Sequence, residues 1–97
     1  MSERALVSEV EEVTAQYEET TGKPATRTRQ MIERHGHIQA LSRLMVSADL
    51  QQGFRALRDA GQLDQTFEAL VVRYSALFSA EVVAAAQWRL DSSDKLL

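Results

Sequence analysis

Apolar residues recur every three or four positions along almost the whole chain, and this spacing limits the possible folds more than any other feature. Such spacing places the apolar side chains on one face of an α-helix. The longest unbroken stripe lies within residues 3–20 and consists of Leu6, Val10, Val13 and Tyr17. No segment has the two-residue alternation that is typical of a half-buried strand. The spacing therefore predicts an all-α fold in which the first helix is the longest.

Capping residues divide the rest of the chain into five shorter helices. Gly22, Gly36 and Gly61 are expected to end the first, second and fourth helices, and at Gly36 we expect a left-handed C-cap. Pro24 is expected at the first position of the second helix, because its missing N–H costs nothing there. The expected N-caps are Ser2 for the first helix, Ser47 or Asp49 for the fourth, Asp64 for the fifth and Ser79 for the sixth.

Six helices joined by short turns predict one domain over residues 1–97, a usual domain size. Short helices cannot run the length of an up-down bundle, so we expect a compact orthogonal array. Residues 1–21 form its acidic amphipathic helix, and the polar residues 91–97 form a frayed tail. The residues expected at the centre of the core are Phe54, Leu57, Phe67, Leu70 and Phe78.

Composition excludes several classes of protein. The hydrophobic fraction of 44% and the charged fraction of 26% are those of a globular chain, not a disordered one. The chain has no cysteine, which excludes a disulfide scaffold, a thiol nucleophile and a thiolate zinc site. No apolar run is long enough to span a membrane, and the acidic N-terminus is unlike a signal peptide. The expected location is the cytoplasm.

Charge is distributed unevenly along the chain. Residues 1–21 hold six Glu and one Arg, whereas residues 22–47 hold four Arg, one Lys and one Glu. An acidic first helix followed by a basic segment predicts ion pairs within the molecule. The alternative is that the two faces meet different partners.

No pattern of residues supports catalysis, a metal ion or another cofactor. His35 and His37 flank a helix break at Gly36, and a zinc site needs at least three protein ligands. The sequence has no Gly-x-Ser-x-Gly elbow and no phosphate-binding glycine loop. Glu68 stands among apolar residues, where we expect a salt bridge or a hydrogen bond to a neighbouring helix end. We therefore predict a protein that is not an enzyme.

Three stretches of the sequence carry a resemblance to a known module. They are Ala25-Thr26-Arg27 with Gln30-Met31-Ile32 and His35-Gly36; Gly53-Phe54 and Leu57 with Gly61-Gln62-Leu63-Asp64-Gln65-Thr66-Phe67-Glu68-Ala69-Leu70-Val71; and Leu77-Phe78-Ser79 with Ala86 and Arg89-Leu90. Over residues 17–90 the chain resembles a small all-helical module of bacterial proteins that has no established activity. It departs from that module at His37, where a second Gly is expected, and at Gln62, where Arg is expected. The resemblance implies a shared helical fold and no site, because the matching positions are caps and core residues.

Two binding functions fit the remaining residues. The segment 27–43 has the pattern of a helix-turn-helix with a turn one residue short, which would place Gln39 and Arg43 at base edges and Arg27, Arg29 and Arg34 on phosphates. The isoelectric point near 5.3 is low for such a domain.

The second function depends on Trp88, which shares a flank of the sixth helix with Glu81 and Ala84. Tryptophan is a common anchor in protein interfaces, although it also covers the edges of cores. We therefore favour a non-enzymatic module that binds another protein or a second copy of itself, with nucleic-acid binding as the alternative.

Overall fold

The computed structural model describes residues 2–46 and 51–93, and every regular element within these ranges is a helix. The longest is α1 (Glu3–Thr21), with 19 residues, as the apolar spacing predicted. Neither α1 nor any other described helix combines the length and the apolar character that crossing a membrane requires. The shorter elements are α2 (Thr26–His35), α3 (His37–Met45), α4 (Gln51–Asp59), η2 (Leu63–Gln65), α5 (Phe67–Arg73), η3 (Ser75–Leu77) and α6 (Ala80–Asp91), where η marks a 3-10 helix.

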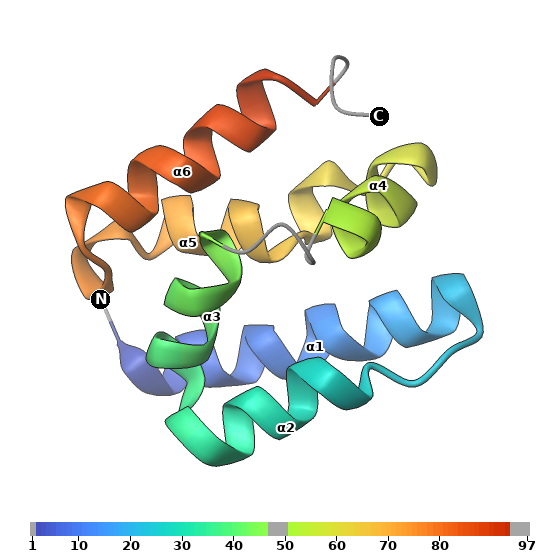
Figure 1. Cartoon of the computed structure of the whole chain (residues 1–97), viewed down its shortest axis with the longest axis horizontal. Coiled ribbons are helices and arrows are strands. Elements are labelled where there is room, and N and C mark those ends of the chain that lie inside the picture. The colour runs from blue at the N-terminus through green and yellow to red at the C-terminus, as the bar shows by residue number, and fades with distance from the viewer. Residues whose placement is uncertain (1, 47–50, 94–97) are drawn as a thin grey trace.

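The helices cross one another instead of forming an up-down bundle. In Figure 1, α1 and α2 occupy the lower part of the molecule, α5 and α6 the upper part, and α3 runs steeply between them. The central helix is α5, which packs against α6, α1 and α3, while α4 packs against α1. This is the compact orthogonal array of short helices that the sequence predicted.

The core lies where the apolar faces of α1, α3, α5 and α6 meet. Of the residues expected at its centre, Phe67 and Leu70 belong to this cluster, and Phe54 and Leu57 are also buried. The expectation for Phe78 was wrong, because it lies in the extended turn between η3 and α6 and is only half-buried. The buried side chains of the cluster are Leu6, Val10, Val13, Leu41, Leu44, Met45, Phe67, Leu70, Val71, Val82 and Ala86.

Several of the predicted helix ends are confirmed. The Ser2 and Ser79 hydroxyls accept hydrogen bonds from backbone N–H groups three residues later, as N-caps do. Gly22 ends α1 in the left-handed conformation. Gly36 also has a positive φ, of 82°, but its ψ of 167° differs from the expected left-handed cap and lies in a region that is open essentially to glycine alone. It separates α2 from α3 without a longer turn.

Two predicted boundaries were wrong. Pro24 does not begin α2, which starts at Thr26 after an irregular N-cap at Ala25. Asp64 does not cap α5, because it lies within η2, and the buried Thr66 is the N-cap instead. The Thr66 hydroxyl accepts from the Ala69 N–H at 3.1 Å and donates to the Leu63 carbonyl at 2.7 Å. The predicted caps Ser47 and Asp49 and the end of the tail, 94–97, lie outside the described residues.

A buried ion pair connects α6 to α5 and α3. The Arg89 Nη1 donates to Glu68 Oε2 at 2.8 Å and to the Leu44 carbonyl at 3.3 Å, and the exposed fractions of Arg89 and Glu68 are 7% and 1%. Leu44 lies in the last turn of α3, where carbonyls lack partners within the helix and a cation is favoured. Burial raises the pKa of the Glu68 carboxyl, and the hydrogen bond from Arg89 opposes this shift. The salt bridge predicted for Glu68 is thus present. Arg89 is buried on α6 together with Val82 and Ala86, whereas its neighbour Leu90 is half-buried.

Candidate functional site

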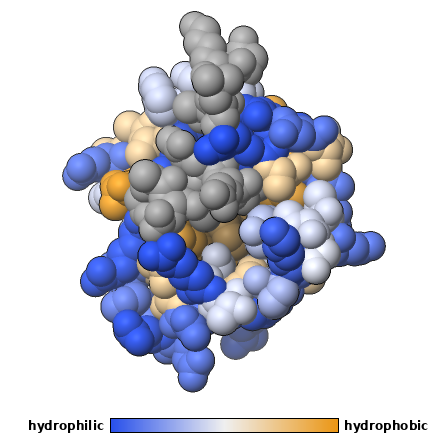
Figure 2. All heavy atoms as spheres, turned by 45° about the vertical axis from the view of Figure 1, so that its right-hand side comes forward, coloured by the Kyte–Doolittle hydropathy of each residue, from blue (hydrophilic) through white to orange (hydrophobic). Residues whose placement is uncertain are grey.

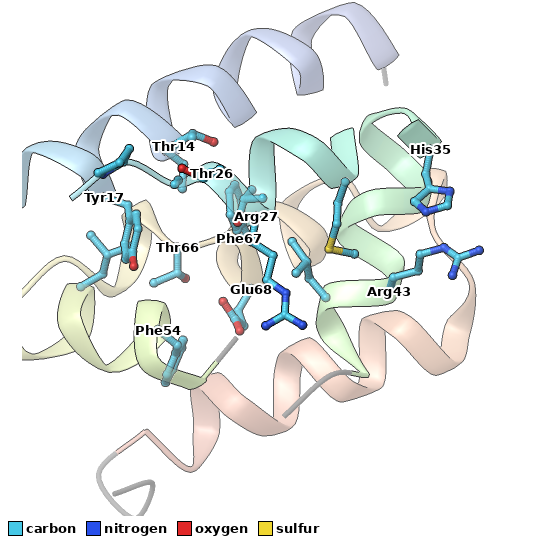
Figure 3. Close-up of a pocket in the computed structure, with 17 residues that line it drawn as sticks. Thr14, Tyr17, Thr26, Arg27, His35, Arg43, Phe54, Thr66, Phe67 and Glu68 are labelled. Carbon is cyan, nitrogen blue, oxygen red and sulfur yellow. The ribbon is translucent and has the colours of Figure 1, made fainter. Parts of the chain in front are cut away.

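A pocket of about 420 Å³ lies between α1, α2, α3, α4 and α5 (Figure 3). Pockets that hold ligands typically have volumes of about 300–1,000 Å³, so this one has room for a small ligand or an anchoring side chain. Much of its wall is apolar, and the apolar side chains come from all five helices. They are Val13, Met31, Leu44, Phe54, Leu57 and Phe67.

The buried polar groups in the wall are engaged in hydrogen bonds within the protein. The Thr14 hydroxyl donates to the Val10 carbonyl at 2.7 Å, and the Thr66 hydroxyl bridges η2 and α5. The Glu68 carboxylate, at the base of the pocket, is held by Arg89. These groups stabilise the fold around the pocket, and the surface that the pocket offers to a ligand is mainly apolar.

Basic side chains border the pocket on the side of α2 and α3. Arg27, His35 and Arg43 line it, and a smaller adjoining hollow is lined by Arg27, Arg34 and His35. Because the two hollows share residues, these four side chains form one continuous surface, which we call the basic rim. Figure 3 shows the Arg27 side chain extending into the pocket and His35 and Arg43 lying at the far end. In Figure 2, hydrophobic residues lie in a hollow between strongly hydrophilic ones.

The Glu18 carboxylate holds the start of α2 in place beside the pocket. Ala25, the N-cap residue of α2, has no side chain that caps the helix. Glu18 Oε2 instead accepts hydrogen bonds from the Ala25 N–H at 2.8 Å and Arg29 Nε at 3.1 Å, while Glu18 Oε1 accepts from Arg29 Nη2 at 2.6 Å. Glu18 therefore connects α1 to the segment that supplies Pro24, Ala25 and Arg27 to the pocket.

This contact leads to a pH prediction. The hydrogen bonds from Arg29 and Ala25 lower the pKa of Glu18 from 4.5 to about 2. A carboxyl whose pKa is lower in the folded state stabilises the fold above its unfolded pKa, and this stabilisation is lost as the pH falls from 4.5 toward 2. In Arg29→Ala we expect the pKa of Glu18 to rise toward 4.5, measured by carboxyl-carbon NMR titration. An unchanged pKa would show that Arg29 does not hold the carboxylate.

Other acidic side chains of α1 are also paired within the molecule. Arg29 contacts Glu11 at 3.4 Å as well as Glu18, which confirms the predicted pairing between the acidic helix and the basic segment for this arginine. Glu9 accepts hydrogen bonds from Arg73 at 2.5 Å and from the Tyr74 hydroxyl, and the bond to Glu9 raises the pKa of Tyr74. These contacts place α1 beside both α2 and α5.

The five residues predicted for nucleic-acid binding do not share one surface. Arg27, Arg34 and Arg43 belong to the basic rim, whereas Arg29 lies on the opposite flank of α2 and pairs with α1. Gln39 is exposed on the side of α3 that faces away from the core. The structure therefore confirms the helix–glycine–helix outline of 27–43 but separates Arg29 from the other basic side chains.

The residues predicted to bind a protein partner lie on a different side of the molecule. Glu81, Ala84 and Trp88 are all exposed on α6, and 59% of the surface of Trp88 is accessible. Their spacing of three and four residues places them on one helix face. The high accessibility of Trp88 fits an exposed anchor better than a residue that covers the edge of the core.

The two histidines point to different surroundings. His35 lines the pocket, whereas His37 Nε2 lies 3.6 Å from Glu11 Oε1 on α1. Within residues 2–46 and 51–93, no group of three or more His, Cys, Asp or Glu side chains gathers closely enough to hold a metal ion.

No protein-family model, curated protein or solved structure matches this chain, so its resemblance to a bacterial helical module stays a prediction.

Proposed function

We propose that this chain is a non-enzymatic module that binds a segment of another protein through the pocket that α1, α2, α3, α4 and α5 enclose. The observation that carries this proposal is an apolar pocket of about 420 Å³ bordered by the basic rim. Aromatic rings and a thioether suit an aromatic anchor, because rings pack edge to face and methionine adapts its shape. The wall supplies these groups from Tyr17, Met31, Phe54 and Phe67.

The basic rim defines the charge of the partner. Guanidinium groups form strong, directional hydrogen bonds with carboxylates, and complementary charge selects partners and steers their approach. Arg43 borders the pocket and Arg34 borders the adjoining hollow, so carboxylates beside the anchor would face guanidinium groups. The proposed partner segment is therefore acidic and carries an exposed aromatic residue.

Three observations favour a protein partner over a nucleic acid. The basic rim borders an apolar pocket on the side of α2 and α3, and an apolar pocket suits a side chain better than a phosphate backbone. Arg29, which a helix-turn-helix contact would need, already pairs with Glu18 and Glu11. The exposed carboxylates Glu12 and Glu19 of α1 would also repel a DNA backbone brought close to α2.

The proposal is tested with two small probes that differ only in charge, N-acetyl-tryptophan and its uncharged amide. The chain is labelled at its methionine methyls, where Met31 lines the pocket and Met45, buried in the core, is an internal control. We expect the acid to shift the Met31 signal more than the amide at equal concentration, with no shift at Met45. Arg43→Glu should weaken the response to the acid several-fold and leave the response to the amide unchanged.

The same labelled chain distinguishes the alternative function. A mixed-sequence DNA duplex that binds tightly, with affinity falling steeply with salt, would overturn the choice of a protein partner. No shift at Met31 with either tryptophan probe at millimolar concentration would overturn the pocket itself as the binding site.

A further inference from the structure

The outer face of α6 has the chemistry that the pocket selects. Trp88 exposes 59% of its surface, which leaves a large aromatic side chain without apolar neighbours on one side. Glu81 lies two turns before Trp88, and Asp91 lies one turn after it. Both are exposed, as are Ala84 and Gln87 on the same face. An aromatic anchor is thus flanked by carboxylates on a helix that is already folded.

The pocket and the α6 face complement each other in charge, and the pocket has room for the ring of Trp88. The face carries Glu81 and Asp91 beside Trp88, and the basic rim carries Arg34 and Arg43 beside an apolar hollow. The small side chain of Ala84, one turn from Trp88, lets another surface approach the ring closely. A single indole ring is smaller than the drug-sized ligands that pockets of this volume accommodate.

We infer that the partner of the pocket is a second copy of this chain, with Trp88 of one copy inserted into the pocket of the next. The inference rests on the proposed function, because it assigns an occupant to the same pocket. No described residue of α6 lines the pocket, and Figure 1 shows α6 at the outer edge of the molecule, away from α1 and α2. The complementary surfaces therefore meet between copies.

The contact is head-to-tail, since it joins two different surfaces. Such heterologous contacts leave one anchor and one pocket unused in every dimer, so assembly continues to a closed ring or an open chain. Association should consequently increase with protein concentration beyond the dimer. Burying the aromatic ring supplies most of the affinity, and the carboxylates orient the incoming helix.

The test uses the full chain, in which Trp88 is the only tryptophan. We expect its fluorescence emission to shift to shorter wavelength as concentration rises, in parallel with an increase in sedimentation coefficient. Two variants should each remain monomeric. Trp88→Ala lacks the anchor, and in Arg34→Glu/Arg43→Glu the charge of these two rim positions is reversed. Mixed in equal amounts, they should form a heterodimer and nothing larger, because one intact anchor meets one intact pocket. Circular dichroism of each variant confirms that it is folded.

A wild-type chain that stays monomeric up to millimolar concentration overturns the inference, as does a mixture of folded variants that does not associate. Adding N-acetyl-tryptophan to Trp88→Ala distinguishes failure of the self-association inference from failure of the proposed function. A shift at Met31 without self-association leaves the pocket as a site for a different acidic partner. The absence of both results overturns both proposals.

Discussion

Arg89→Met is expected to lower the free energy of unfolding by about 3–5 kcal/mol, the usual cost of removing one partner from a buried ion pair. The guanidinium is replaced by an apolar side chain, and Glu68, at 1% exposure, keeps its carboxyl in the interior without the bond at 2.8 Å. The Leu44 carbonyl at the end of α3 loses a donor as well. For a domain with a total stability of about 5–15 kcal/mol, this is a large share, and urea unfolding measures it directly.

The double variant Glu68→Leu/Arg89→Met is the matched control. Replacing both members of a buried pair by apolar residues is often neutral or stabilising, so the double variant should be more stable than Arg89→Met alone. The reason is that the cost of the single change comes from the carboxyl left behind, not from the loss of an intrinsically strong attraction. A double variant as unstable as the single one would mean that Arg89 matters for packing and not for its charge.

The pH dependence of the same variant gives an independent check. Burial raises the pKa of Glu68, so its contribution to stability is greatest below the unfolded pKa near 4.5 and is lost as the pH rises through the folded value. Without Arg89 the ionised form is more costly still. The loss in free energy of unfolding caused by Arg89→Met, relative to the wild type, should therefore be smaller at pH 4 than at pH 7. Comparison at each pH removes the separate contribution of Glu18, which is present in both proteins.

The fold was predictable from the sequence because each helix buries one continuous stripe. Leu6, Val10 and Val13 are spaced for a helix and are all buried, and the glycines that interrupt the stripes end helices at Gly22 and Gly36. These are local properties of the chain, and they require no knowledge of which helices meet. The all-helical class and the long first helix follow from them.

Details that depend on contacts between helices were not predictable in the same way. Arginine is ordinarily a surface residue, and only the packing of α6 beside Glu68 and the end of α3 makes Arg89 an inward side chain. Asp64 and Thr66 are both good capping residues, and the buried Thr66 hydroxyl at the start of α5, which accepts from the Ala69 N–H, is the cap that forms. Pro24 was misplaced because Glu18, seven residues before Ala25 and on another helix, fixes where α2 begins.

In the candidate site, too, local features were predictable from the sequence and contacts between helices were not. The sequence identified Arg27, Arg34 and Arg43 as a basic group, but it grouped them with Arg29, since neighbouring arginines on a short helix look equivalent until the adjacent helix is placed. The pocket was missed altogether. Its wall combines five helices, so no single stretch of sequence contains its pattern. A signal was nevertheless present in Met31 and His35, which lie four residues apart on the inward flank of α2.

Phe54→Ala is expected to lower the free energy of unfolding by about 3–5 kcal/mol, the range for truncating a buried phenylalanine. Phe54 is the largest of the fully buried side chains, at 2% exposure, and it comes from α4, which packs on α1. At roughly 4–8 °C for each kcal/mol in a domain of this size, the melting temperature should fall by at least about 12 °C.

Phe78→Ala provides the control with the same chemistry. Phe78 is only half-buried in the turn before α6, so part of its ring is in water in the folded state and its truncation leaves a shallower gap. The transfer free energy lost scales with the apolar area that was buried, and a cavity adds to it only where the surroundings cannot close. We therefore expect Phe78→Ala to shift the melting temperature clearly less than Phe54→Ala in parallel calorimetric scans. Equal shifts would mean that the turn before α6 is as important to the core as α4, contrary to the packing described for these two rings.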